Sequence, residues 1–210
     1  LRMEAEQGIG HVVATPHFYA NYDTPEKFLE KRARAEEQLR KAMEQEENLP
    51  QLHIGAEVYF FRGISSCEEL PQLTMDGGRF LLVEMPQPPW TESMYRELEE
   101  IYTRQGLVPV IAHIDRYIRP LKTYGIPKRL EKLPVLVQAN ADFFLKSATR
   151  GMALAMLKKD RIHLLGSDCH NLRSRKPNLR EALEIIAGKT GGQVLERLRS
   201  CERDTLELSE

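Results

Sequence analysis

The chain has 210 residues, 41% of them hydrophobic, and its 30 Lys and Arg residues nearly balance its 31 Asp and Glu residues. This length suits one α/β domain, so we expect a single domain over residues 1–210. The charge balance gives no electrostatic reason to expect a nucleic-acid partner, and the apolar runs are too short for membrane insertion. Three irregularly placed cysteines do not resemble a disulfide framework, which favours a cytoplasmic protein.

Six short apolar runs separated by helical patterns predict alternating strands and helices. The opening residues LRMEAEQG indicate a helix closed by Gly8. Strands are expected at residues 11–15, 52–60, 79–84, 108–114, 135–139 and 162–167. Helices are expected after the N-caps Thr24, Thr91 and Asn178, and around residues 128–132, 148–158 and 193–199.

Each predicted strand ends in a polar side chain that can bind a metal or a phosphate. From Glu57 to Asp168, successive ends lie 27 to 29 residues apart, which is about one strand plus one helix and two short loops. If parallel strands close into a barrel, their carboxyl ends share one face, so these side chains should converge. The runs and their terminal residues are ATPH (His17), GAE (Glu57), LLVE (Glu84), VIAH (His113), VQAN (Asn140) and LLGSDCH (Asp168 and His170).

Carboxylates at buried strand ends need cations, because burying an unpaired charge is costly. A divalent metal satisfies carboxylates and accepts neutral imidazoles as further ligands, and a mixed nitrogen and oxygen set suits Mn²⁺, Fe or Zn²⁺. Six groups exceed the needs of one ion, so two or more ions are expected. The predicted ligands are His17, Glu57, Glu84, His113, Asp168 and His170.

Other polar residues of the pattern are predicted to serve the site less directly or not at all. Asn140 is a poor metal ligand and is expected to hydrogen-bond either substrate or a ligand. His11, His53 and His163 precede their strands, which places them on the opposite rim in structural or solvated roles.

Two arginines are candidates for phosphate binding. Arg116 follows His113 by three residues, and its planar fork suits phosphate oxygens. Arg175, in the loop before the next helix, could act in the same way or could be solvated surface. The main hypothesis is therefore metal-assisted hydrolysis of a phosphomonoester, with Arg116 neutralising the phosphoryl oxygens.

Three other functions are compatible with parts of the sequence. Residues 169–175 match the Cys-x5-Arg spacing of cysteine phosphatases, but the segment has no glycine, and Asp168 beside Cys169 would raise the pKa of the thiol. A second rival is a non-catalytic barrel that binds a phosphorylated peptide or a partner kinase. The third is a nuclease or a phosphatase of small phosphomonoesters.

In their order and spacing, the motifs ATPH, GAE, LLVE, VIAHIDRY and GSDCHN resemble those of the PHP (polymerase and histidinol phosphatase) superfamily. IAHIDRY points within it to the manganese-dependent protein tyrosine phosphatases of bacterial capsule and exopolysaccharide clusters. The resemblance implies a distorted seven-stranded, TIM-like β/α barrel. It also implies up to three ions, with the six predicted ligands and both Arg116 and Arg175 in the site.

The resemblance further implies a substrate and a partner. The expected substrate is phosphotyrosine in the tail of a bacterial tyrosine kinase that controls polysaccharide chain length. One departure concerns the N-terminus, because that family opens with an Asp-x-His-x-His strand that is absent here. We therefore expect a first strand to be missing from this chain, which would then be N-terminally truncated with a depleted metal site.

Overall fold

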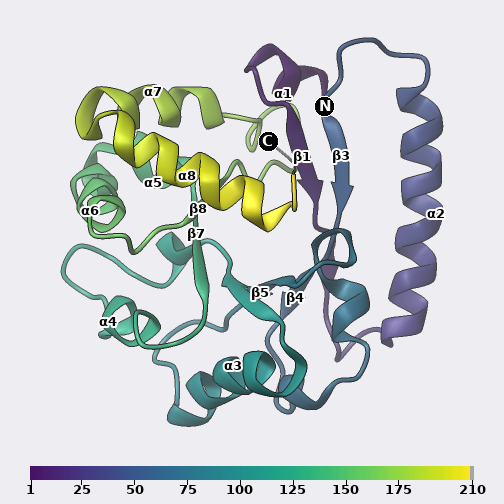
Figure 1. Cartoon of the computed structure of the whole chain (residues 1–210), viewed down its shortest axis with the longest axis horizontal. Coiled ribbons are helices and arrows are strands. Elements are labelled where there is room, and N and C mark those ends of the chain that lie inside the picture. The colour runs from purple at the N-terminus through teal and green to yellow at the C-terminus, as the bar shows by residue number, and fades with distance from the viewer. Residues whose placement is uncertain (209–210) are drawn as a thin grey trace.

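The alternation of short apolar runs and amphipathic segments folds into parallel strands covered by helices (Figure 1). The computed structural model describes residues 1–208. All strand pairs are parallel. The strands are β1 (His11–Ala14), β2 (His17–Phe18), β3 (Gln51–Ile54), β4 (Glu57–Tyr59), β5 (Phe80–Glu84), β6 (Val108–Ile111), β7 (Leu136–Asn140) and β8 (Leu164–Gly166).

Helices connect most of these strands and follow the last one. The α-helices are α1 (Arg2–Glu6), α2 (Pro25–Met43), α3 (Glu92–Gln105), α4 (Ile126–Leu130), α5 (Ala141–Leu145), α6 (Ser147–Lys158), α7 (Leu179–Thr190) and α8 (Gly192–Thr205). Short 3-10 helices are η1 (Ile64–Ser66), η2 (Leu70–Leu73), η3 (Met75–Gly77) and η4 (Ile114–Arg116). None of the helices in residues 1–208 is long and apolar enough to cross a membrane.

The strands form a two-stranded sheet, β1-β3, and a six-stranded sheet in the order β2-β4-β5-β6-β7-β8. Figure 1 shows β1 and β3 side by side, with α2 running along β3. The strand predicted at residues 11–15 corresponds to β1, but β2 was not predicted and follows after Thr15 and Pro16, where proline lacks a ladder donor. The single strand predicted at residues 52–60 was wrong in one respect, because the run is interrupted at Gly55 and Ala56.

The two breaks lie side by side, and the backbone bonds around them continue. The Gly55 amide donates to the Ala14 carbonyl at 2.9 Å, and the Glu57 amide donates to the Pro16 carbonyl at 3.0 Å. Beyond the breaks, β4 pairs with β2 on one side and with β5 on the other. The interruption therefore turns the chain from the small sheet into the large one and delivers His17 and Glu57 to neighbouring positions.

The helix boundaries follow their predicted signals, with two exceptions. Thr24 and Thr91 accept hydrogen bonds from amides in the first turns of α2 and α3, and Gly106 ends α3 in the left-handed region at φ 69°. Asn178 precedes α7 as predicted, but its side chain donates to Asp142 and does not cap the helix. Helix α5 was not predicted.

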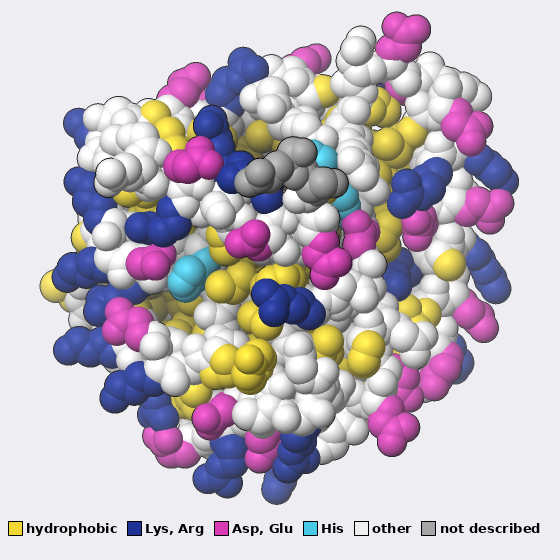
Figure 2. All heavy atoms as spheres, in the orientation of Figure 1, with side chains coloured by type: hydrophobic (Ala, Val, Ile, Leu, Met, Phe, Trp, Pro, Cys, Tyr) yellow, Lys and Arg dark blue, Asp and Glu magenta, His cyan; other side chains and the backbone are white. Residues whose placement is uncertain are grey.

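The core fills both faces of the strands. Its fully buried side chains come from strands and from the inner faces of helices, including Leu81, Leu98, Phe143 and Phe144. A second, smaller apolar cluster lies around Val110. Figure 2 shows acidic and basic side chains interspersed on the face that it presents, as expected from the balanced composition.

Candidate metal centre

Three predicted ligands meet across β2, β4 and β5: His17 and Glu57 open β2 and β4, just beyond the carboxyl ends of β1 and β3, and Glu84 ends β5. His17 and Glu57 are register partners in the sheet, and Glu84 is the register partner of Tyr59. His17 Nδ1 lies 3.7 Å from Glu57 Oε1 and 3.8 Å from Glu84 Oε2. One ligand atom from each of the three residues lies within 4.8 Å of the other two. The strands thus bring together one imidazole and two carboxylates from distant parts of the sequence.

The environment of His17 fits a divalent cation. Its Nδ1 atom is buried and has no hydrogen-bond partner, although buried polar atoms are nearly always satisfied. The two carboxylates that it faces lie beyond hydrogen-bond distance. Ligand atoms roughly 2 Å from a shared ion lie up to about 4 Å apart, so these separations suit an ion among the three groups.

His113 is directed into the same cluster by an unusual backbone conformation. It follows β6 with φ 33° and ψ 60°, in the left-handed region that non-glycine residues seldom adopt. The buried ring donates from Nε2 to Glu57 Oε1 at 2.9 Å and lies 3.5 Å from Glu84 Oε1. Strain of this kind is concentrated at functional sites.

Asp168 forms a second part of the site, held by cationic and amide donors. It also has a positive φ, of 48°. Its Oδ2 atom accepts from Arg116 at 2.6 Å and from the side-chain amide of Asn140 at 3.3 Å, and it forms an ion pair with Arg175 at 2.5 Å. This contact favours a role for Asn140 in supporting a predicted ligand.

Arg116 links the two parts of the site. One guanidinium nitrogen contacts Asp168, and the other donates to Glu84 Oε1 at 3.1 Å. Burial alone would lower the pKa of Arg116, but the negative charges of Asp168 and Glu84 outweigh it, and the pKa is raised. The guanidinium therefore stays charged at neutral pH.

His170 lies at the outer side of the cluster. Its ring centroid is 5.8 Å from that of His17, and its Nδ1 atom lies 3.5 Å from Asp168 Oδ1. All six predicted ligands and both predicted arginines thus occur in one connected group. Their roles as metal ligands and phosphate binders remain predictions.

Several residues near the site were missed from the sequence. Asp115 is partly buried, and its carboxylate accepts a hydrogen bond from the backbone amide of Asn140 at 2.9 Å. Burial raises the pKa of Asp115. The ring of Tyr19 stacks on His17 at 5.6 Å and lies 5.5 Å from that of Tyr59. Burial, followed by Glu84 and Glu57, raises the pKa of Tyr19. Tyr19 lies two residues after His17 in an extended segment, and side chains at this spacing point to the same side. This spacing was the available signal in the sequence.

Glu4 of α1 was also missed, although it reaches the Asp168 end of the site. It is buried, and Oε1 accepts from Ser167 Oγ at 3.0 Å, while Oε2 has no partner within the described chain. Nothing in the local pattern of α1 distinguishes this glutamate from the neighbouring Glu6, which is exposed at the helix end.

The structure argues against Cys169 as a nucleophile. Burial, followed by the charge of Glu4, raises the pKa of its thiol, whereas a nucleophilic cysteine needs a lowered one. The amides that would have to face a phosphate are also occupied, because Asn171 Oδ1 accepts from Arg173, Ser174 and Arg175 at 2.9, 2.8 and 3.2 Å. The Cys-x5-Arg match is therefore a coincidence of spacing.

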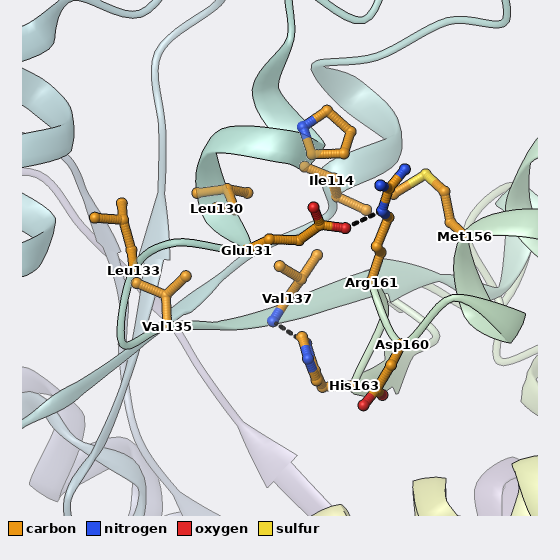
Figure 3. Close-up of a pocket in the computed structure, with 11 residues that line it drawn as sticks. Ile114, Leu130, Glu131, Leu133, Val135, Val137, Met156, Asp160, Arg161 and His163 are labelled. Carbon is orange, nitrogen blue, oxygen red and sulfur yellow. Dashed lines mark hydrogen bonds and ion pairs between the residues drawn. The ribbon is translucent and has the colours of Figure 1, made fainter.

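The remaining histidines have structural partners. His53 contacts Asp76 through Nδ1 and lies 3.0 Å from His11 Nδ1 through Nε2. His163 Nδ1 accepts from the Val137 amide at 3.0 Å, as Figure 3 shows. These contacts agree with the expectation that the three histidines lie apart from the cluster.

A cavity of about 220 Å³ lies between α4, β7 and the end of α6 (Figure 3). Its walls are largely apolar, with Leu130, Val135 and Met156 among them. Its polar members are already paired, since Arg161 contacts Glu131. None of the predicted ligands or arginines lines this cavity, so the candidate chemistry belongs to the strand ends.

The fold and the site together define an α/β protein with a curled parallel sheet, on which β2, β4 and β5 carry a histidine and carboxylate cluster suited to divalent cations. The chain belongs to the capsular polysaccharide synthesis family CpsB/CapC, which it matches over residues 1–205. This confirms the resemblance found in the motifs.

Individual relatives give the same picture. The chain is 28% identical to the tyrosine-protein phosphatase CpsB of Streptococcus pneumoniae over 208 residues, covering 91% of this chain and 82% of that protein. It is 26% identical to the tyrosine-protein phosphatase YwqE of Bacillus subtilis over 207 residues, covering 92% and 76%.

The fold is also that of a solved structure. A crystal structure from a report on YwqE and CpsB as metal-dependent tyrosine phosphatases superposes with a TM-score of 0.81 at 21% identity. The match covers 100% of this chain and 85% of that one. It establishes the α/β architecture, while a closed, seven-stranded barrel stays a prediction.

Proposed function

We propose that this chain hydrolyses phosphotyrosine in proteins with the help of divalent metal ions, and that it thereby regulates capsular or exopolysaccharide synthesis. The observation that carries the proposal is the placement of Arg116 and Arg175 on Asp168, beside the group of His17, Glu57 and Glu84. Two arginine forks next to a cation site match the needs of phosphoryl transfer. The named activity of the relatives supports the same conclusion.

The proposed cofactor is Mn²⁺, with Fe or Zn²⁺ as alternatives, and the proposed number of ions is two to three. His17, Glu57 and Glu84 would hold one ion, and His113, Asp168 and His170 would contribute to the others. When bound, such ions supply positive charge and lower the pKa of water toward neutrality, so that hydroxide is available for hydrolysis. The orphaned Nδ1 atom of His17, which faces both carboxylates, supports this donor set.

The side chains of the chain itself would bind and orient the substrate. The forks of Arg116 and Arg175 would bind phosphoryl oxygens and neutralise charge that develops there. The ring of Tyr19, stacked on His17, would contact the aromatic ring of the substrate. A phenolate is a stable leaving group, so the reaction makes little demand on a general acid.

The direct test is turnover of a phosphotyrosine peptide, measured with the metal content of the same sample. We expect activity with two or three equivalents of metal, loss after prolonged chelation, and recovery with Mn²⁺. Alanine at His113 or Asp168 should abolish turnover, whereas Cys169→Ser should retain it. Full activity after exhaustive metal removal would exclude the mechanism, and binding without turnover in the metal-loaded protein would favour a non-catalytic phosphopeptide-binding protein.

Further details belong to the same proposal. We infer one domain over residues 1–210 that belongs to the seven-stranded, TIM-like barrels of PHP type. The proposed partner is a bacterial tyrosine kinase that carries the phosphotyrosine. The cytoplasmic location expected from cysteine usage stays a prediction.

A further inference from the structure

Large hydrophobic side chains are exposed mainly on loops that follow site residues. A single exposed apolar residue is ordinary, but a concentration of them around one opening marks a contact surface. Four of the five within residues 1–208 lie in loops after β2, η4 and β8, and only Tyr102 lies on a helix. The four are Tyr22 (87% exposed), Leu121 (100%), Tyr124 (42%) and Leu172 (75%).

Two of these loops are strongly basic in a chain that is otherwise balanced. Residues 116–129 contain five Lys or Arg residues and residues 169–178 contain three, and neither segment contains Asp or Glu. Within the described chain, five of these cations are exposed and have no carboxylate within ion-pair distance. Lys128 lies on α4, and the four that lie in loops are Arg119, Lys122, Arg173 and Lys176.

Both basic loops border the same site. Arg116 from the first loop and Arg175 from the second form ion pairs with the same oxygen of Asp168, at 2.6 and 2.5 Å. The loop with Tyr22 follows β2 and therefore borders the same cluster, because the ring centroid of His17 in β2 lies 5.8 Å from that of His170 in the second basic loop. We call Arg119, Leu121, Lys122, Leu172, Arg173 and Lys176 the basic rim.

We propose that the basic rim binds the residues that flank the phosphotyrosine and selects an acidic peptide segment with an apolar side chain. This rests on the proposed function of the site. The phosphate itself would use Arg116 and Arg175, which leaves the four rim cations for carboxylates of the flanking sequence. Leu121 and Leu172 offer contacts for an apolar side chain between those carboxylates.

The test compares three substrates: an acidic phosphotyrosine peptide, the same peptide with Asn and Gln in place of Asp and Glu, and p-nitrophenyl phosphate. At low salt, the wild-type protein should prefer the acidic peptide about tenfold in kcat/KM, and 0.5 M NaCl should reduce this preference. The quadruple variant R119Q/K122Q/R173Q/K176Q should lose the preference and hydrolyse p-nitrophenyl phosphate at the wild-type rate.

A matched control removes four exposed lysines outside the basic loops, in K132Q/K158Q/K159Q/K189Q. This variant has the same net charge as the rim variant and should keep the peptide preference. Equal loss of preference in both variants would show a general charge effect and overturn the proposal.

Binding of the labelled peptides, measured by fluorescence anisotropy, separates failure of the rim from failure of the catalytic proposal. Selective binding of the acidic peptide without turnover of any substrate would support the rim and contradict the phosphatase activity. Turnover of p-nitrophenyl phosphate with equal treatment of both peptides would overturn the rim and leave the phosphatase intact. Rim-dependent sedimentation with phosphatidylglycerol vesicles, with no peptide preference, would assign the surface to membranes and also overturn the proposal.

Discussion

Replacing Arg116 by lysine tests the proposed role of the guanidinium fork. Arg116 contacts Glu84 at 3.1 Å and Asp168 at 2.6 Å through two different nitrogens, and lysine can keep the charge but not both contacts. A hydrogen bond involving charged groups contributes about 1.5–3 kcal/mol. Because the side chain is 33% exposed, we take a solvent-screened loss of about 1–2 kcal/mol. This corresponds to roughly a 5- to 30-fold fall in kcat/KM.

The assay is steady-state hydrolysis of p-nitrophenyl phosphate by the metal-loaded protein, with metal content measured for every variant. The fall should appear mainly in kcat, because the contact to phosphoryl oxygens strengthens as charge develops. Arg119→Lys, three residues further along the same loop, is the matched control and should stay within about twofold of wild type on this substrate. An Arg116→Lys variant with wild-type kcat and full metal content would refute the reasoning.

Three further predictions address the aromatic contact, the buried imidazole and the core. Tyr19→Ala should lower kcat/KM for an aryl phosphate about 2- to 12-fold but not for an alkyl phosphate, and Tyr19→Phe should restore it; equal losses on both would exclude aromatic recognition. Burial lowers the pKa of His163, so the stability it confers is complete above the unfolded pKa of about 6.5 and falls below it. Urea unfolding of the metal-free protein should therefore show a smaller decline from pH 7 to 5 in His163→Asn than in wild type, and parallel curves would contradict this. Leu98→Ala should cost about 2–5 kcal/mol in urea unfolding while the fully exposed Leu121→Ala changes stability by less than about 0.5 kcal/mol, and similar values for both would be inconsistent with the described core.

The sequence was most informative where a residue occupies the end of a parallel strand. Glu84, which ends β5, and His113, which follows β6, could be assigned to one edge because strand direction places them there, whereas Glu57 reaches the cluster from the start of β4, after the break that follows β3. The sequence was less informative where tertiary contacts set the backbone. The interruption at Gly55 depends on close packing, since a Cβ atom there would lie 3.4 Å from Met75 and from Thr15.

Conformations of the connecting segments were also beyond sequence patterns. Helix α5 begins directly after Asn140, which ends β7 and precedes the helix without a separating loop. The left-handed backbone of His113 has no signature in residue type, because glycine is the usual choice at such positions. Asp115 and Tyr19 were missed for a related reason, since Asp115 lies in the short 3-10 helix η4 and Tyr19 in the loop after β2, both outside the periodic elements.

The turn closed by Asn171 has a consequence for how such proteins diversify. One amide oxygen gathers three successive N–H groups and so determines the course of the backbone up to Arg175. The side chains of Leu172 and Arg173, which project from this turn into solvent, carry no structural task. Evolution can therefore exchange them to suit new binding partners, while Arg175 keeps its position beside Asp168.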